Sequence, residues 1–96
     1  MLLEILQEHK AQIEALARRY GAGQIRVFGS VARREEGPHS DIDLLVVLPS
    51  GYDLFAQRLP LTAELEALLG RPVDLIPEHE LNQHLRSAIL KEALPL

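Results

Sequence analysis

Residues 29–43 read GSVARREEGPHSDID, so that a Gly-Ser pair is followed after ten residues by Asp-x-Asp. Apolar runs typical of buried strands flank this stretch, residues 24–28 before it and residues 42–48 at its end. The Gly-Ser pair comes where the first strand would pass into a short helix, so its backbone N–H groups and the helix N-terminus can face an anion. The stretch therefore predicts an α/β domain with an anion-binding turn.

Asp41 and Asp43 stand at the start of the second strand. Residues i and i+2 of a strand project to the same side, so both carboxylates are predicted to point into one small volume. Two carboxylates about 4 Å apart repel each other by about 4 kcal/mol at an effective dielectric constant of about 20, and the pair therefore requires a cation. A phosphate site beside a divalent cation is typical of phosphoryl and nucleotidyl transfer. The alternative is that the two residues face solvent at the strand end, or that Asp41 caps a turn.

The composition sets the scale of the protein and excludes several function classes. Its 96 residues, 47% of them hydrophobic, predict a single domain over 1–96 with no second domain for a substrate. The formal net charge is -4 and the ten basic residues are scattered, which argues against a nucleic-acid groove and favours a nucleotide or a protein acceptor. The absence of cysteine excludes a disulfide framework and a thiolate metal site. No apolar run is long enough to span a membrane and the N-terminus does not resemble a signal peptide, so we expect a cytoplasmic protein.

Hydrophobic periodicity predicts a small sheet flanked by helices. An amphipathic first helix covers residues 2–20 and stops at Gly21. Ser30 is the expected N-cap of a helix of one or two turns, which Gly37-Pro38 closes. The strand over residues 42–48 is nearly continuous in apolar residues, as expected of a central strand that is covered on both faces.

A longer helical segment follows this strand. Asp53 can cap a helix that runs to Leu69, where Gly70 supplies a left-handed stop. Pro60 would either kink this helix or mark the first turn of a second one, and the sequence does not decide between the two.

The last part of the chain predicts one more strand and one more helix. Residues 73–76 form the strand and place Asp74, a third aspartate, among apolar neighbours. The helix covers residues 78–93 and carries an apolar face made of Leu81, Leu85, Ala88 and Ile89. The element order αβαβαβα predicts an α/β (α+β) domain built on a small mixed sheet.

Three segments resemble the motifs of the polymerase beta type nucleotidyltransferase superfamily: GSVAR at 29–33, SDIDL at 40–44 and VDL at 73–75. Within that superfamily, the length of the chain is similar to that of the minimal nucleotidyltransferases, the MntA-like antitoxins that pair with HEPN ribonuclease toxins. The Gly-Ser pair, the gap of ten and Asp-x-Asp together match by chance about once in a few thousand proteins of this length. The resemblance covers nearly the whole chain and implies the nucleotidyltransferase fold.

The resemblance implies a role for each matching residue. Gly29 and Ser30 would hold the β and γ phosphates of a nucleoside triphosphate, which by family habit is ATP. Asp41 and Asp43 would bind two Mg²⁺ ions. Asp74 would be the third carboxylate, which in relatives shares a metal and helps to deprotonate the attacking hydroxyl. The reaction would be an in-line attack on the α phosphate with pyrophosphate as the leaving group.

Arg33 and Ser40 lie within the matching segments and are further candidates for binding the nucleotide. Arg33 is equally suited to a phosphate and to a salt bridge with a nearby carboxylate. Asp74 taken alone could also cap a loop. One departure concerns Arg34, because many relatives have glycine directly after the Ala-Arg pair. Details of this helix in relatives therefore do not transfer to this chain.

Three functions are compatible with these residues. The first is a Mg²⁺-dependent nucleotidyltransferase that moves AMP from ATP to a hydroxyl, by resemblance a tyrosine, of a HEPN-type toxin, in a hetero-oligomer without direct contact to nucleic acid or membrane. The second is a non-catalytic antitoxin that neutralises a toxin by contact and has a vestigial nucleotide site. The third is a small-molecule nucleotidyltransferase, which would need a dimer or a partner to complete its acceptor pocket. The three aspartates favour catalysis, because a dead site has no physical reason to keep mutually repelling carboxylates.

Overall fold

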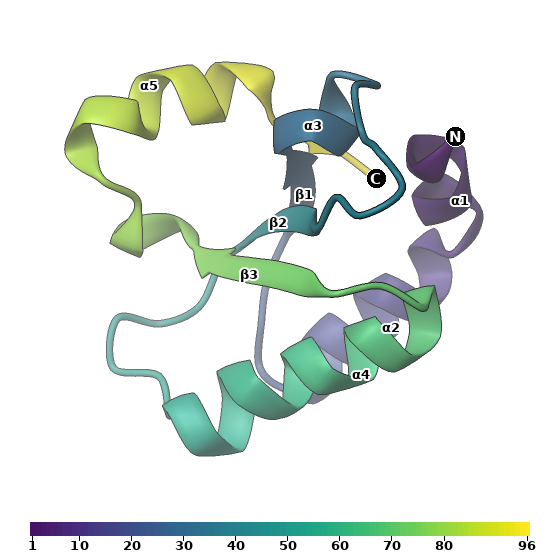
Figure 1. Ribbon diagram of the computed structural model, residues 1–96. Helices are drawn as coiled ribbons and strands as arrows, with labels where there is room; N and C mark the ends of the chain where they lie inside the picture. The colour runs from purple at the N-terminus through teal and green to yellow at the C-terminus, as the bar shows by residue number, and fades with distance from the viewer.

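The computed structural model describes residues 1–96, and its centre is a four-stranded mixed sheet in the order β3-β2-β1-β4 (Figure 1). The strands are β1 (Ile25–Phe28), β2 (Ile42–Val46), β3 (Val73–Pro77) and β4 (Leu94–Pro95). β1 runs antiparallel to β2 and to β4, whereas β2 and β3 are parallel. The predicted α/β class with a small mixed sheet is confirmed.

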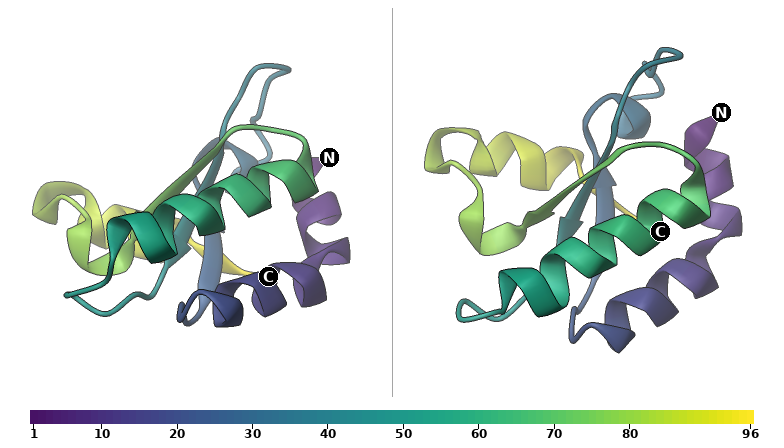
Figure 2. Two further views of the ribbon diagram at one scale, coloured as in Figure 1. Left: turned by 90° about the horizontal axis from the view of Figure 1, so that it is seen from below. Right: turned by 60° about the horizontal axis from the view of Figure 1, so that its bottom comes forward.

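Two helices cover one face of the sheet, and a third lies on the other side. α2 (Lys10–Arg19) and α4 (Leu59–Leu69) lie side by side, and α5 (Gln83–Glu92) lies across the sheet from them (Figure 1, Figure 2). The other helical segments are short: α1 (Leu2–Glu8), α3 (Gly29–Ala32), the π-helical turn η1 (Leu54–Arg58) and the 3-10 turn η2 (Glu78–Glu80). None of these helices combines the length and the apolar character that crossing a bilayer requires.

The core lies between β2 and the two helices α2 and α4. Ile42, Leu44 and Val46 of β2 are fully buried, and Leu45, which alternates with them along the strand, is buried as well. The prediction of a central strand covered on both faces is therefore confirmed for Ile42–Val46, whereas the predicted end at residue 48 is wrong, because β2 ends at Val46 and Val47 is exposed. The residues of other elements in the same core cluster include Ile13, Ala17, Val27, Leu61 and Leu65.

The predicted first helix over residues 2–20 is wrong in one respect, because the structure divides it into α1 and α2 at His9. The backbone of His9 leaves the helical region with φ -97° and ψ 12°, and its Nδ1 lies 2.9 Å from the carbonyl oxygen of Ile5. Each helix has its own packing partner: α1 contacts α3, whereas α2 contacts α4 and β1. Ile5 is consequently exposed, although the periodicity of a continuous helix assigns it to the buried face.

The short helix α3 begins and ends earlier than the sequence predicted. It starts at Gly29, with Phe28 as its N-cap and without a side-chain cap, so the predicted capping role of Ser30 is wrong. It ends because Arg34 adopts a left-handed conformation with φ 58° and backbone N–H groups beyond the helix donate back to its carbonyls. Gly37-Pro38 therefore lies beyond the helix and does not close it.

The conformation of Arg34 predicts the effect of a substitution on stability. A left-handed backbone costs an L-residue about 1 kcal/mol relative to glycine, and the Arg34–Glu4 ion pair is about half exposed and contributes little. We expect Arg34→Gly to raise the free energy of unfolding by up to about 1 kcal/mol in urea denaturation. Arg34→Ala loses the same ion pair and keeps the strained backbone, so it is the matched control. Equal stability of the two variants would show that backbone strain at this position is negligible.

The segment from Asp53 to Gly70 has the predicted ends. Asp53 caps η1, since its Oδ1 accepts hydrogen bonds from the N–H groups of Phe55 at 2.9 Å and Ala56 at 3.0 Å. Gly70 ends α4 in the left-handed conformation with φ 69°. Of the two alternatives for Pro60, the second is found, because Pro60 lies in the first turn of α4 after η1.

The predicted last helix over residues 78–93 is wrong in its extent and in its packing. The chain opens into an extended conformation at Leu81 after η2, and the side chain of Asn82 then caps α5. The face that the periodicity assigned to the core is not buried: Leu85 is 56% exposed, and no residue of α5 is buried. After α5 the chain pairs with β1 as the short strand β4, which the sequence did not predict.

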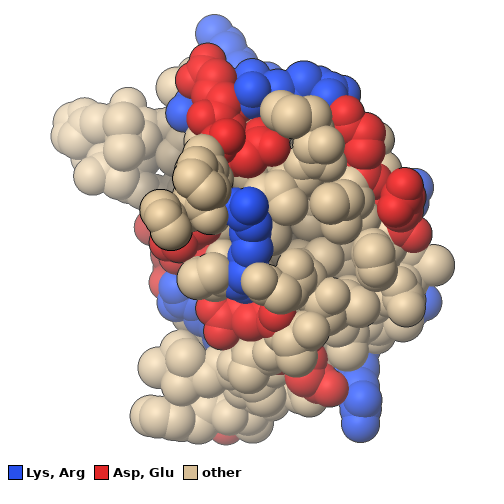
Figure 3. All heavy atoms as spheres, turned by 45° about the vertical axis from the view of Figure 1, so that its right-hand side comes forward, with Lys and Arg blue, Asp and Glu red and all other residues tan.

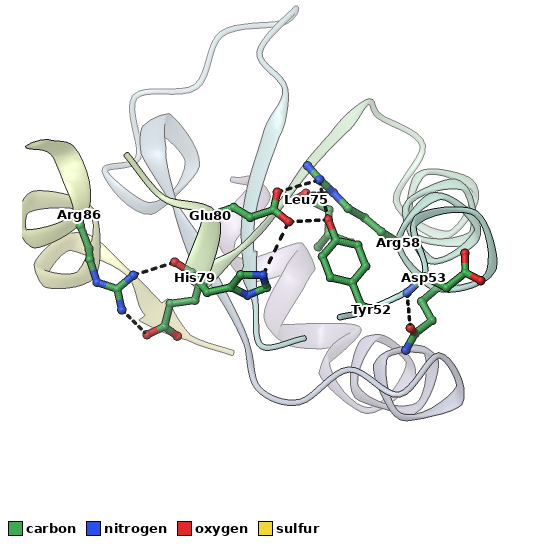
Figure 4. A network of polar contacts seen from close by, with 9 residues as sticks. Tyr52, Asp53, Arg58, Leu75, His79, Glu80 and Arg86 are labelled. Carbon is green, nitrogen blue, oxygen red and sulfur yellow. Dashed lines mark hydrogen bonds and ion pairs between the residues drawn. The ribbon is translucent and has the colours of Figure 1, made fainter. Parts of the chain in front are cut away.

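Polar contacts hold η2 and the start of α5 in place (Figure 4). Arg58 donates to the hydroxyl of Tyr52 at 3.0 Å and to Glu80 at 3.2 Å, and Tyr52 donates to Glu80 at 2.6 Å. Arg86 of α5 donates to the carbonyl oxygen of Glu78 at 2.8 Å, and its Nη2 lies 3.5 Å from the carboxylate of the same residue. The N-terminal end of α5 is thus attached to the body of the protein through a charged pair.

Candidate active site

Asp43 and Asp74 lie next to each other on the two parallel strands. The register pairs Asp43 of β2 with Asp74 of β3, and paired residues of neighbouring strands project to the same face. Asp43 is partly buried and Asp74 is exposed. Asp41 stands just before β2 and is exposed as well. Two elements that are distant in sequence therefore bring two of the three predicted carboxylates together.

The electrostatics of Asp43 show the influence of the two other aspartates on this carboxyl group. Partial burial raises the pKa of Asp43 above its usual range, and the negative charges of Asp74 and Asp41 raise this pKa further. No group of three or more His, Cys, Asp or Glu side chains converges closely enough to enclose a metal ion, and Asp41 lies outside the strand. The structure thus holds Asp43 and Asp74 as a pair, with Asp41 at its margin. All three offer carboxylate oxygens, the ligands that Mg²⁺ prefers, and a cation would relieve their repulsion, so the residues fit a Mg²⁺ site.

Gly29 lies against Asp43 where β1 passes into α3. Its φ is 73°, in the left-handed region that favours glycine, and a Cβ at this position would overlap Oδ2 of Asp43 and lie 3.1 Å from its Cγ. The pairing of Phe28 with Asp43 across β1 and β2 fixes this close approach. The glycine is therefore required by the neighbouring carboxylate, in addition to any role toward a phosphate.

A carboxylate from the end of α5 already occupies the N–H of Gly29. Glu92 accepts a hydrogen bond from this N–H through Oε2 at 2.8 Å and another from Nη1 of Arg33 through Oε1 at 2.5 Å. Partial burial opposes ionisation of Glu92, but the hydrogen bonds from Arg33 and Gly29 hold its pKa below the usual value. Arg33 also lies 3.3 Å from Glu35, and its pKa is raised by Glu92 and then by Glu35. Of the two alternatives for Arg33, the structure contains the salt bridge.

The two predicted serines lie in different settings. Ser30 follows Gly29 within α3 and is partly buried. Ser40 closes the loop before Asp41, because its Oγ accepts from the N–H of Gly37 at 2.8 Å. The structure therefore places Ser30 in the turn after β1, whereas the hydroxyl of Ser40 is engaged within its own loop.

The surface offers no open cleft at this position. None of its three hollows is lined by Gly29, Asp43 or Asp74. On the face that Figure 3 shows, acidic and basic side chains alternate without a large field of either sign. The candidate site is thus an arrangement at the surface, in which Glu92 and Arg33 fill the space beside Gly29.

The arrangement combines oxygen donors for a cation with donors for an anion. Asp43 and Asp74 supply the carboxylate oxygens for a cation. The N–H of Gly29 and the guanidinium of Arg33 supply the hydrogen-bond donors for an anion. Such a combination can hold a metal–polyphosphate and stabilise charge that develops during phosphoryl or nucleotidyl transfer. Sequence reasoning missed Glu92, since no motif distinguishes it from the other acidic residues and it is separated from Gly29 by most of the chain.

Comparison with known proteins adds independent observations. The family model described as a nucleotidyltransferase domain matches residues 9–96. The protein adenylyltransferase MntA of Thermococcus cleftensis is 37% identical over 90 residues, which cover 94% of this chain and 87% of that protein. The solved structure of a candidate minimal nucleotidyltransferase is 44% identical with a TM-score of 0.85, covering 98% of this chain and 95% of its own. A chain in a crystal structure of a toxin–antitoxin with AMP-PNP is 25% identical with a TM-score of 0.73, over 88% of this chain and 69% of that chain.

Proposed function

Because this chain belongs to the nucleotidyltransferase domain family, we propose that it is the catalytic antitoxin of a two-protein system and transfers AMP from ATP to a hydroxyl of its partner in a Mg²⁺-dependent reaction. The family and the similarity to a protein adenylyltransferase make the chain a nucleotidyltransferase. The observation that carries the choice of chemistry is the pairing of Asp43 with Asp74 directly beside Gly29. The similar chain in a complex with AMP-PNP supports an adenine nucleotide as the donor.

The aspartates would hold the metal. Asp41, Asp43 and Asp74 would bind two Mg²⁺ ions, which when bound neutralise charge on the attacking and leaving oxygens. Their carboxylates are acceptors only, and without a cation their mutual repulsion raises the pKa of Asp43 after the effect of burial. Binding of a divalent cation therefore reverses an unfavourable interaction that the fold itself imposes.

The turn after β1 would bind the phosphates. The N–H of Gly29 and the hydroxyl of Ser30 donate to the β and γ phosphates, and the guanidinium of Arg33 is within reach of the same acceptors because it shares Glu92 with Gly29. Ser40 acts through its loop, since its hydroxyl contacts Gly37 and thereby fixes the approach to Asp41.

The chemical step is an in-line displacement at the α phosphorus. The acceptor oxygen forms a bond to the α phosphorus, the bond between this phosphorus and the oxygen bridging to the β phosphate breaks, and pyrophosphate leaves with that oxygen. The proton of the acceptor hydroxyl passes to the carboxylate of Asp74, which is exposed and can approach an incoming group. Asp43 is less accessible and would remain a metal ligand.

The acceptor in this proposal is a second protein. The similar chain in a toxin–antitoxin complex supports such a partner, and the resemblance to MntA-like antitoxins implies a HEPN-type toxin with a tyrosine as the modified residue. No hollow of the surface is lined by the aspartates, which favours a protein surface over a small-molecule acceptor. A hetero-oligomer of the two proteins is therefore expected.

Isotope transfer tests this function. The purified protein, together with the partner that co-purifies with it, is incubated with Mg²⁺ and with ATP labelled at either the α or the γ phosphate. We expect a labelled partner band from α-labelled ATP, no label from γ-labelled ATP, and complete loss of the signal with EDTA. Label from the γ position would identify a kinase instead. No label on a partner that co-purifies with this chain would leave contact alone as the means of neutralisation.

A further inference from the structure

The anion-binding groups beside Asp43 are occupied by the protein itself. Glu92 uses one carboxylate oxygen for the N–H of Gly29 and the other for the guanidinium of Arg33. We propose that Glu92 is an internal competitor of the nucleotide, so that the phosphates of ATP reach Gly29 and Arg33 only when the end of α5 moves away. This inference rests on the proposed function of the site and describes how access of the nucleotide to it is regulated.

The competition follows from the chemistry of the two groups. A carboxylate and a phosphate are both anions that accept hydrogen bonds from the same N–H donors. The contacts of 2.8 Å to Gly29 and 2.5 Å to Arg33 leave no room for a phosphate oxygen at the same N–H. Glu92 and the phosphates therefore exclude each other at Gly29.

The charge of Glu92 strengthens this exclusion. Glu92 adds its negative charge to those that raise the pKa of Asp43, where burial is the largest cause and Asp74 and Asp41 follow. In the absence of nucleotide, the repulsion between Glu92 and Asp43 is offset by the hydrogen bonds that Glu92 receives from Arg33 and Gly29. The phosphates of a bound nucleotide replace Glu92 at its donors, and their negative charge repels its carboxylate, so both interactions favour release of Glu92 once the nucleotide is present.

The attachment of α5 permits such a movement. No residue of α5 is buried, so displacement of its last turn exposes little apolar surface. Its attachments are the Arg86–Glu78 contact at one end and, at the other, Glu92 and the contacts with α3. The chain then continues into β4, which pairs with β1 through two residue pairs, and ends at Leu96, which packs against the core. The far end of α5 can therefore move about its attachment at η2 while the core stays intact.

Binding measurements on the complete chain test the competition. We expect Glu92→Gln and Glu92→Ala to lower the dissociation constant for ATP with Mg²⁺ by about tenfold in calorimetry. This is the effect of removing the state in which Glu92 contacts Gly29 and Arg33, if that state holds about nine-tenths of the molecules. Inorganic pyrophosphate, which has neither base nor ribose, is a second probe. The two Glu92 variants should bind pyrophosphate more tightly by the same factor, because the competition concerns only the N–H groups that donate to the phosphates.

Glu35→Gln is the matched control. This variant removes the same charge from the other carboxylate partner of Arg33, at 3.3 Å, but Glu35 has no contact with Gly29. We expect its affinity for ATP and for pyrophosphate to equal that of the wild type. An equal gain in the Glu35 and Glu92 variants would mean that only net charge matters, and it would overturn the competition.

Hydrogen exchange gives a readout that is independent of affinity. In the wild type without nucleotide, the Gly29 amide should be protected, and addition of ATP with Mg²⁺ should increase exchange in the last turn of α5. Unchanged exchange in α5 together with equal or weaker binding by the Glu92 variants would overturn the inference and leave the nucleotide site in place. Failure of the wild type and of every variant to bind ATP would instead contradict the proposed function.

Discussion

Substitution of Asp43 by Asn is expected to reduce nucleotidyl transfer by about a thousandfold and to leave the fold intact. Asp43 stands between Asp74, its partner on β3, and Gly29, its neighbour at the turn. Asn has nearly the same shape, but it lacks the negative charge that a divalent cation needs. The measurement is the initial rate of AMP transfer at saturating Mg²⁺ and ATP, with binding of the partner protein followed in the same samples.

Asp53→Asn is the matched control for this variant. It makes the same chemical change at an exposed residue whose side chain caps η1, and Asn caps helices as well as Asp does. We expect wild-type transfer from this control. Transfer at the wild-type rate by Asp43→Asn would show that the metal assignment is wrong.

Asp43→Asn is also expected to be more stable than the wild type when no metal is present. The pKa of Asp43 is raised in the folded protein by burial and then by Asp74 and Asp41, so the unfolded chain loses this proton more readily than the folded protein does. The contribution of Asp43 to the free energy of unfolding therefore falls as the pH rises from the pKa of this group in the unfolded chain through its raised pKa in the folded protein. At neutral pH, the ionised carboxylate of Asp43 destabilises the folded protein. Thermal melting in EDTA should show a higher Tm for Asp43→Asn, whereas added Mg²⁺ should raise the Tm of the wild type more than that of the variant.

Gly29→Ala is expected to abolish transfer and to destabilise the protein by about 2 kcal/mol. The new Cβ would overlap Oδ2 of Asp43, and the φ of 73° would be strained for any residue with a side chain. Either Asp43 or the turn after β1 must then move, and each movement separates the metal ligands from the phosphate donors. Transfer rates and urea denaturation of the same preparation measure the two effects.

Two other glycines separate the causes of this effect. Gly70→Ala introduces the same kind of strain, with φ 69°, but has no atom within 4 Å of the new Cβ, and Gly51→Ala introduces neither strain nor contact. We expect Gly70→Ala to lower stability and keep transfer, and Gly51→Ala to change neither. If Gly29→Ala behaves like Gly70→Ala, the close approach to Asp43 has no catalytic importance.

The parts of the fold that sequence predicted correctly are those set by local patterns. The apolar run of β2 could be recognised because a strand buried on both faces has few polar residues, and Gly70 ends α4 because a left-handed stop favours glycine. The break at His9 was missed because it depends on the different packing partners of α1 and α2. The exposed face of α5 was missed for a related reason: the spacing of Leu85 and its neighbours shows that an apolar face exists, not that another element covers it.

The residues of the candidate site could be proposed from the sequence, but their arrangement could be predicted only in part. The spacing of Gly29 and Asp43 follows from a strand, a turn and a strand that are close in sequence. The pairing of Asp43 with Asp74 depends on the register between β2 and β3, which no local pattern specifies. Glu92 could not be predicted at all, because its position follows from the path of α5 and its partner is a backbone N–H that any acidic residue could use.

The parallel pairing of β2 and β3 also determines when the two central carboxylates meet during folding. β1 and β2 are antiparallel neighbours in sequence and can pair early, whereas β3 reaches β2 only after the crossover through η1 and α4 has closed. The repulsion between Asp43 and Asp74 therefore arises late, when the packing of α4 against the sheet can compensate for it. Contacts that form after the transition state affect mainly the unfolding rate. Mg²⁺ is accordingly expected to slow unfolding of this protein and to leave its folding rate nearly unchanged.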